Sequence, residues 1–294
     1  MTRAEPFPFV IATDGSPQSR AAMLAATLFP WPRGAGPTVV IARGGGPFGH
    51  RWGGSGTAVE HALERVVSGA RRALARRWPG ADVVVVDKAP EVAILGRARA
   101  LRAQAIVVGF HGHSALSRAV LGSVSRGVVR RATCAVLVVK GRPRQMRRFV
   151  LAFDGSPTAQ RALALTQRLE VPADGEITLI QVVEPVRPPS AALLPAPARR
   201  VVMAEAAALQ TERVRAAEHA IERAGRPLER CGWQLKTMVR AGVPLEELLK
   251  TVVETRADAL ILGARGVGLL ERILLGSVAE GVLARSPVSA LIVR

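Results

Sequence analysis

Residues 9–17 read Phe-Val-Ile-Ala-Thr-Asp-Gly-Ser-Pro, and residues 149–157 repeat them as Phe-Val-Leu-Ala-Phe-Asp-Gly-Ser-Pro, at an offset of 140 residues. Further along, Ala-Ile-Val-Val-Gly at 105–109 returns as Ala-Leu-Ile-Leu-Gly at 259–263, at an offset of 154 residues. A repeat of this length corresponds to a whole domain and not to a solenoid unit. The sequence therefore predicts two tandem domains, residues 1–142 and 143–294.

Each copy contains short apolar runs separated by longer helical patterns, and the second copy has additional residues in the Pro-rich segment 184–200. Continuous Val, Ile and Leu runs that alternate with helices are typical of a parallel sheet covered on both faces. The sequence thus predicts the α/β fold class, with a doubly wound, five-stranded, mostly parallel sheet in each domain. We expect strands near 8–13, 38–42, 82–88, 105–109 and 135–140, and again near 148–153, 176–183, 233–239, 259–263 and 288–293. We expect helices in the second copy near 157–170, 200–224, 244–256 and 277–285.

Composition is that of a globular protein, with 49% hydrophobic and 22% charged residues. A net charge of +18 suits anionic partners, but the Arg residues are spread along the helices, so we expect no nucleic-acid partner. No apolar stretch approaches the length of a membrane span, and the N-terminus lacks the apolar core of a signal peptide. The two cysteines, Cys134 and Cys231, cannot form a disulfide framework. We therefore expect a cytoplasmic protein without a membrane partner.

The first strand of each copy ends in an acidic residue, Asp14 or Asp154, followed by Gly-Ser-Pro. A carboxylate at the carboxyl end of a strand can accept hydrogen bonds from ribose hydroxyls or from an adenine amine, and ligands of such sheets bind at that edge. The same pattern suits an N-cap, because Asp and Ser are favoured caps and Pro is favoured in the first helical turn. The residues alone leave both interpretations open.

The fourth strand of each copy runs into the spacing Gly-x2-Gly-x9-Gly-Ser, although most residues between the glycines differ. Glycines let the backbone approach a pyrophosphate closely, and the final Gly-Ser opens a helix whose N–H groups attract anions. We therefore expect a phosphate-binding loop in each domain, the alternative being a turn with an ordinary helix cap. Ser277 and Glu280 predict a capping box in the second copy alone. The loop residues are Gly109, Gly112, Gly122 and Ser123, and Gly263, Gly266, Gly276 and Ser277.

Together these motifs resemble the universal stress protein family, and more specifically the tandem-domain members of its ATP-binding branch. The resemblance covers nearly the whole chain and is especially clear in residues 276–280, 286–288 and 291–293. It implies the strand order 3-2-1-4-5 in each domain and an intramolecular pseudo-dimer in which the two fifth strands pair. It also implies one ATP site per domain and leaves open whether Mg²⁺ accompanies the nucleotide.

The resemblance assigns three kinds of contact by position. An acid contacts the nucleoside, the glycine loop with its Ser and the backbone of the following Val holds the phosphates, and a residue after the second strand presents its backbone to adenine. Besides the glycines, these residues are Asp14, Ala42, Ser123 and Val124, and Asp154, Val182, Ser277 and Val278. The first copy departs from the family pattern in the Gly-rich segment 43–56. We therefore expect the ATP site of the second domain (site 2) to be more reliably filled than that of the first domain (site 1).

Other motifs are weaker. A Gly-x-Gly-x-x-Gly match at 44–49 follows the second strand and is interrupted by Pro47, so we do not read it as a dinucleotide fingerprint. We interpret His-Gly-His at 111–113 as loop histidines, because no Cys, Asp or Glu lies nearby to complete a metal site. Cys134 adjoins a Val-rich strand and is interpreted as a buried apolar residue, not a nucleophile.

Three classes of function stay open. The first is an ATP-binding regulatory protein of the stress response, which acts through nucleotide-dependent conformation or binding of an unknown protein partner. The second is a slow ATP hydrolase, although Glu271 is the one additional acid near either loop and phosphoryl transfer needs a fuller constellation. The third, nucleic-acid binding, rests on charge alone. We expect the first, without catalytic residues, and leave open a homodimer of the whole chain.

Overall fold

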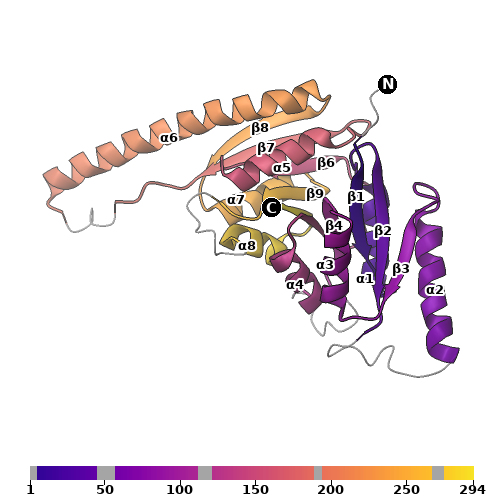
Figure 1. Ribbon diagram of the computed structural model, residues 1–294. Coiled ribbons are helices and arrows are strands. Elements are labelled where there is room, and N and C mark those ends of the chain that lie inside the picture. The colour runs from indigo at the N-terminus through magenta and orange to yellow at the C-terminus, as the bar shows by residue number, and fades with distance from the viewer. Residues whose placement is uncertain (1–4, 45–56, 112–120, 189–193, 267–274) are drawn as a thin grey trace.

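The computed structural model describes residues 5–44, 57–111, 121–188, 194–266 and 275–294 (Figure 1). Strands and helices alternate, as the apolar runs predict. The first repeat contains β1 (Phe7–Ala12), α1 (Pro17–Leu28), β2 (Ala35–Ala42), α2 (Thr57–Leu74), β3 (Asp82–Val86), α3 (Pro90–Ala100), β4 (Ala105–Gly109), α4 (Ser123–Arg131) and β5 (Ala135–Val139). The second contains β6 (Arg148–Ala152), α5 (Pro157–Arg168), β7 (Glu176–Val183), α6 (Ala196–Arg230), β8 (Gln234–Ala241), α7 (Pro244–Glu254), β9 (Ala259–Gly263), α8 (Ser277–Arg285) and β10 (Ser289–Val293).

All ten strands of the described residues form one sheet in the order β3-β2-β1-β4-β5-β10-β9-β6-β7-β8. Each repeat therefore has the strand order 3-2-1-4-5, and pairing inside each repeat is parallel. The α/β fold class, the strand order and the pseudo-dimer are confirmed. The domain boundary between residues 142 and 143 falls in the connection from β5 to β6 and stays a prediction.

The two repeats meet where β5 pairs with β10, the antiparallel pair in the sheet. Leu137 lies opposite Leu291, and the neighbouring pairs are Val136 with Ile292 and Val138 with Ala290. Leu137 and Leu291 are equivalent residues at the offset of 154, so a pseudo-twofold axis passes through this pair. Both side chains are fully buried, and each terminal strand thus covers the sheet edge of the other.

Two layers of helices cover the sheet, and each layer spans both repeats. On one face, α1, α2, α5 and α6 bury an aromatic-rich cluster in which Phe29 and Phe149, from different repeats, meet edge-on at 5.8 Å between ring centroids. On the other face, α3, α4, α7 and α8 pack on an aliphatic cluster that includes Val138 and Ile292. Because each cluster draws residues from both repeats, the core on each face of the sheet continues from one domain into the other.

Helix α6 has 35 residues and is longer than the predicted helix 200–224. Figure 1 shows it lying alongside β8, the strand that comes next in the chain, and projecting beyond the sheet at its N-terminal end. At 1.5 Å per residue it is about 50 Å long. Pro227 lies inside the helix, and Gly225 lets it approach β8, because a Cβ there would lie 2.5 Å from Leu235 Cδ2.

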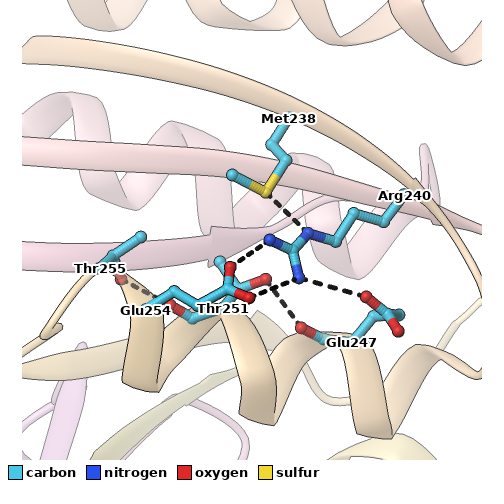
Figure 2. A network of polar contacts seen from close by, with 6 residues as sticks. All are labelled: Met238, Arg240, Glu247, Thr251, Glu254 and Thr255. Atoms are coloured by element: carbon cyan, nitrogen blue, oxygen red, sulfur yellow. Dashed lines mark hydrogen bonds and ion pairs between the residues drawn. The ribbon is translucent and has the colours of Figure 1, made fainter.

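The second repeat holds α7 against β8 through a polar network, which Figure 2 shows. Arg240 on β8 contacts Glu247 at 3.2 Å and also pairs with Glu254, both on α7, while its Nε donates to Met238 Sδ. The Arg240 side chain is only 18% exposed. The hydrogen bond with Glu254 raises the pKa of Arg240, and it lowers the pKa of Glu254.

This network predicts an acid-dependent contribution to stability. Since the folded-state pKa of Glu254 lies below its ordinary value of 4.5, the contribution is present above about pH 4.5 and is lost as the pH falls through the folded-state value. We expect Arg240→Met to lower the free energy of unfolding at pH 7 only modestly, because the Glu254 side chain is 41% exposed and solvent screens its ion pair. The difference from wild type should shrink towards pH 3.5. Urea denaturation at pH 7 and pH 3.5 measures this difference, and Lys88→Met, which removes an exposed lysine of the other repeat, is the control. An equal difference at both pH values would contradict the prediction.

Candidate functional site

The predicted site residues after the first strand of each repeat form the same tight turn. Ser16 N donates to Asp14 Oδ1 at 2.9 Å, and Ser156 N donates to Asp154 Oδ1 at 3.0 Å. The glycine that follows each acid has a positive φ, 74° at Gly15 and 77° at Gly155, a region that other residues rarely adopt. Each carboxylate is thus fixed at the carboxyl edge of the sheet by its own backbone.

The N-cap of the following helix is the serine and not the acid. Ser16 Oγ accepts a hydrogen bond from Ser19 N at 3.1 Å, and Ser156 Oγ accepts one from Ala159 N at 3.2 Å. Pro follows in the first helical position of both α1 and α5, as the sequence predicts. The N-cap that the pattern suits is therefore confirmed, at Ser16 and Ser156, and the acids are not the caps.

The glycine loops after β4 and β9 are closed at their base in the same way. Gly122 N donates to Phe110 O at 2.9 Å, and Gly276 N donates to Ala264 O at 2.8 Å. Residues 112–120 and 267–274 lie outside the described residues, and Gly112 falls among them. In both repeats, therefore, the last glycine of the spacing is hydrogen-bonded to the residue that directly follows the preceding strand, β4 or β9.

Gly266 lies beside the acid of its own repeat. It is exposed, and a Cβ added to it would lie 2.9 Å from Asp154 Oδ2. The structure therefore brings together two residues that the sequence places 112 positions apart. The glycine loop and the acid turn of the second repeat border one area of the carboxyl edge, between the neighbouring strands β6 and β9.

The first glycine of each spacing supports packing. A Cβ on Gly109 would lie 3.0 Å from Gln18 O, and one on Gly263 would lie 2.8 Å from Ala159 N. Both glycines thus let the first turn of α1 or α5 approach the end of the neighbouring strand. In the second repeat Thr158 also donates to Arg265 O, which ties this turn to the glycine loop.

Helices α4 and α8 begin at the last glycine of the spacing, because Gly122 and Gly276 are their N-caps. Ser277 is the first helical residue and makes no cap hydrogen bond, so the predicted capping box of Ser277 and Glu280 is wrong. A capping box requires Ser277 to be the N-cap, but the helix starts one residue earlier, with Gly276 as the N-cap. Ser123 and Ser277 are exposed in the first turn, whereas Val124 and Val278 are partly buried against the aliphatic cluster.

The residues expected beside adenine are the last of β2 and the penultimate residue of β7. Ala42 and Val182 are equivalent at the offset of 140 and both are partly buried. Each strand is hydrogen-bonded to the strand that carries the acid, since Thr13 N donates to Val40 O at 3.0 Å and Phe153 N donates to Ile180 O at 2.8 Å. The predicted nucleoside and adenine contacts therefore lie on neighbouring strands.

Two cations near the loops were not singled out from the sequence. Lys140 lies over the Phe110 ring at 4.3 Å, and burial lowers the pKa of its ammonium to about 8. The equivalent residue at the offset of 154 is Arg294. Their shared position at the end of the repeated fifth strand is the signal that could have drawn attention to them.

Burial raises the pKa of the Cys134 thiol to about 11. The thiol therefore stays protonated at neutral pH, as the interpretation as an apolar residue requires. Within the described ranges, no group of three or more His, Cys, Asp or Glu side chains could hold a metal ion, and no helix is long and apolar enough to cross a membrane.

Two doubly wound repeats, each with an acid turn after its first strand and a glycine-bounded loop after its fourth, define the class of protein. Residues 8–140 and 146–294 each match the Universal stress protein family. The chain belongs to this family, and its tandem arrangement follows from the two matches.

Comparison with individual proteins agrees with the family. The chain is 35% identical to a universal stress protein of Methanocaldococcus jannaschii over 78 residues, which are 26% of this chain and 48% of that relative. It thus spans about half the length of that relative. It is 28% identical to a universal stress protein of Mycobacterium bovis over 208 residues, 65% of this chain and 62% of the relative. A universal stress protein from Archaeoglobus fulgidus has a similar fold, with a TM-score of 0.62, 20% identity and 98% of each chain covered.

Proposed function

We propose that the chain binds one ATP in each repeat and acts in the stress response as a regulatory protein whose conformation or partners depend on the nucleotide. The observation that carries the proposal is the duplicated edge of the sheet. In each repeat a helix with a glycine N-cap starts at the end of one strand, and the neighbouring strand is followed by a fixed carboxylate.

The helix starts supply the phosphate contacts. The first N–H groups of a helix have no partner within it, and a glycine N-cap offers no side chain to satisfy them. These N–H groups and the helix dipole favour an anion. The exposed hydroxyls of Ser123 and Ser277 lie in the same first turns. A triphosphate would thus meet the backbone N–H groups of Ser123 and Val124 in site 1, and those of Ser277 and Val278 in site 2, while Gly122 and Gly276 let it approach closely.

The acid turns supply the nucleoside contacts. Asp14 and Asp154 each bind their own backbone through Oδ1, which orients the carboxylate at the strand end. A carboxylate held in this way can accept hydrogen bonds from ribose hydroxyls. Ala42 and Val182 would present backbone groups to adenine from the neighbouring strand. Mg²⁺ would enter with the triphosphate, because magnesium bound with a nucleotide is held largely by phosphate oxygens and water.

We place the protein in the cytoplasm. Cys134 and Cys231 are both free thiols, which suits a reducing compartment.

Asp154→Ala tests the division between nucleoside and phosphate contacts. We expect it to weaken ATP binding about 10- to 150-fold, the effect of losing one hydrogen bond to a charged group worth about 1.5–3 kcal/mol. Binding of inorganic triphosphate at the same site should change much less. Isothermal titration of both ligands, with site 1 blocked by Gly112→Glu, measures the difference. Asp82→Ala, which removes an exposed acid at the start of β3 in the other repeat, is the matched control.

An equal loss for both ligands would remove Asp154 from the nucleoside contacts. It would leave the carboxylate with the turn that it forms with Ser156. Release of inorganic phosphate, followed in the same samples, separates a binding protein from a slow ATP hydrolase.

A further inference from the structure

The terminal cation of the first repeat contacts a helix of the second. Lys140 Nζ donates to Ser286 O at 2.8 Å and lies 3.4 Å from Ala284 O. These carbonyls belong to the C-terminal end of α8. The backbone N–H of Lys140 also donates to Ser289 Oγ at 3.1 Å, which fixes the residue across the junction between β5 and β10.

Arg294 makes the reciprocal contact from the second repeat to the first. Its Nη2 donates to Arg130 O at 2.8 Å and also to Val129 O, both in the last turn of α4. Carbonyls at the end of a helix lack partners within it, and a cation there also interacts favourably with the helix dipole. Helices α4 and α8 are therefore each capped by a cation from the opposite repeat.

Each cation also stands next to the base of the glycine loop of its own repeat, which is loop 1 after β4 and loop 2 after β9. The Lys140 ammonium lies over the ring of Phe110, whose carbonyl accepts the hydrogen bond from Gly122 that closes loop 1. Val293, which directly precedes Arg294, accepts a hydrogen bond from Ala264 N at 2.7 Å, and the carbonyl of Ala264 accepts the hydrogen bond from Gly276 that closes loop 2. Burial, and then the nearby charge of Arg265, lower the pKa of Arg294. Each glycine loop is therefore connected, through one cation, to the C-terminal end of a helix in the other repeat: loop 1 through Lys140 to α8, and loop 2 through Arg294 to α4.

We propose that Lys140 and Arg294 couple the two nucleotide sites, so that filling one raises the affinity of the other. This inference rests on the proposed function. Phosphate bound at the start of α4 fixes the helix and the carbonyls that Arg294 contacts at its end, and Arg294 lies beside loop 2. Lys140 provides the same connection between loop 1 and α8. The second nucleotide then meets a helix and a cation that the first has already ordered.

The coupling is measured from binding constants of ATP. The Gly266→Glu variant keeps only site 1, and the Gly112→Glu variant keeps only site 2. Each variant gives the association constant of ATP for a single site. The coupling factor is the product of the two stepwise association constants of the wild-type chain, divided by the product of the two single-site constants. We expect a factor of at least about 5, the lower end of typical coupling between sites. In Lys140→Met/Arg294→Met it should fall to about 1, with single-site constants changed by less than about threefold.

Two variants serve as controls. Lys250→Met removes an exposed cation from α7 and should keep the wild-type factor, and Lys140→Arg keeps the positive charge and should keep it too. A factor near 1 in the wild-type chain, or an unchanged factor in the double Met variant, would overturn the coupling while leaving two ATP sites. No ATP binding at either site would overturn the proposed function and the coupling together.

Hydrogen exchange gives a second test that does not depend on how the double variant folds. With site 2 blocked by Gly266→Glu, ATP at site 1 should slow the exchange of the last-turn amides of α8, from Leu283 to Ser286. The amides of α7 should respond less, because the hydrogen bonds of the two cations within the described residues go to α8 and α4 and not to α7. Unchanged exchange at the end of α8 on ATP binding would overturn the path through Lys140.

Discussion

Replacing Gly266 by Glu is expected to lower ATP affinity at site 2 by at least about 100-fold, or about 2.7 kcal/mol. The new side chain would meet Asp154 at its first carbon, since a Cβ at this position lies 2.9 Å from Asp154 Oδ2. Its carboxylate would also repel the phosphates that the start of α8 attracts. The fold should survive because Gly266 is exposed at the edge of the sheet. Titration of ATP against wild type and variant measures the loss.

The double variant Gly112→Glu/Gly266→Glu should lose both sites. Gly96→Glu is the matched control, since it adds the same charge on α3, where nothing lies within 4 Å of a Cβ. Wild-type ATP affinity in the double variant would show that the repeated glycine spacing does not form the phosphate sites.

A chain that ends at Arg142 is expected to self-associate or aggregate. It would carry β5 without β10, and the strand that loses its partner contains Val136, Leu137 and Val138, all at most 1% exposed in the full chain. An uncovered apolar edge pairs with another strand. Sedimentation velocity should show dimers or larger species across the micromolar range.

The full-length chain is the control for this experiment, because its two terminal strands cover each other. A stable monomer of residues 1–142 would contradict the role given to the β5–β10 pair. So would two halves that tumble independently in the intact chain by NMR relaxation.

The fold was largely predictable because the repeat supplied two independent copies of each signal. The Val, Ile and Leu runs of β4 and β9 match their expected spans, since buried parallel strands leave an uninterrupted apolar pattern. The strand order and the pairing of β5 with β10 came from the family resemblance, because periodicity alone carries no information on strand neighbours.

The length of α6 could not be predicted from local signals. Pro227 would normally end a helix, because it lacks an N–H and clashes with the preceding turn. The helix continues past Pro227 to Arg230, because Leu228 is buried in the core and Gly225 lets the helix pack closely against β8. Tertiary packing therefore outweighed the local preference.

The site was predictable only in part. The spacing located the glycines, but it could not separate Gly109 and Gly263, which support helix packing, from Gly266, which adjoins an acid. The assignment of the helix cap to Ser16 and Ser156 required atomic positions. The contacts of Lys140 and Arg294 depend on the register of β5 against β10, which no pattern within one repeat encodes.

The most direct test of the central claim is the number of ATP molecules bound by the intact chain, counted by native mass spectrometry during a titration with ATP. The account predicts species with one and then two nucleotides per chain. It also predicts that Gly266→Glu stops at one and that Gly112→Glu/Gly266→Glu binds none. A wild-type chain without bound nucleotide at millimolar ATP, or a double variant that still binds two, would contradict the claim that each repeat holds one ATP at its glycine loop.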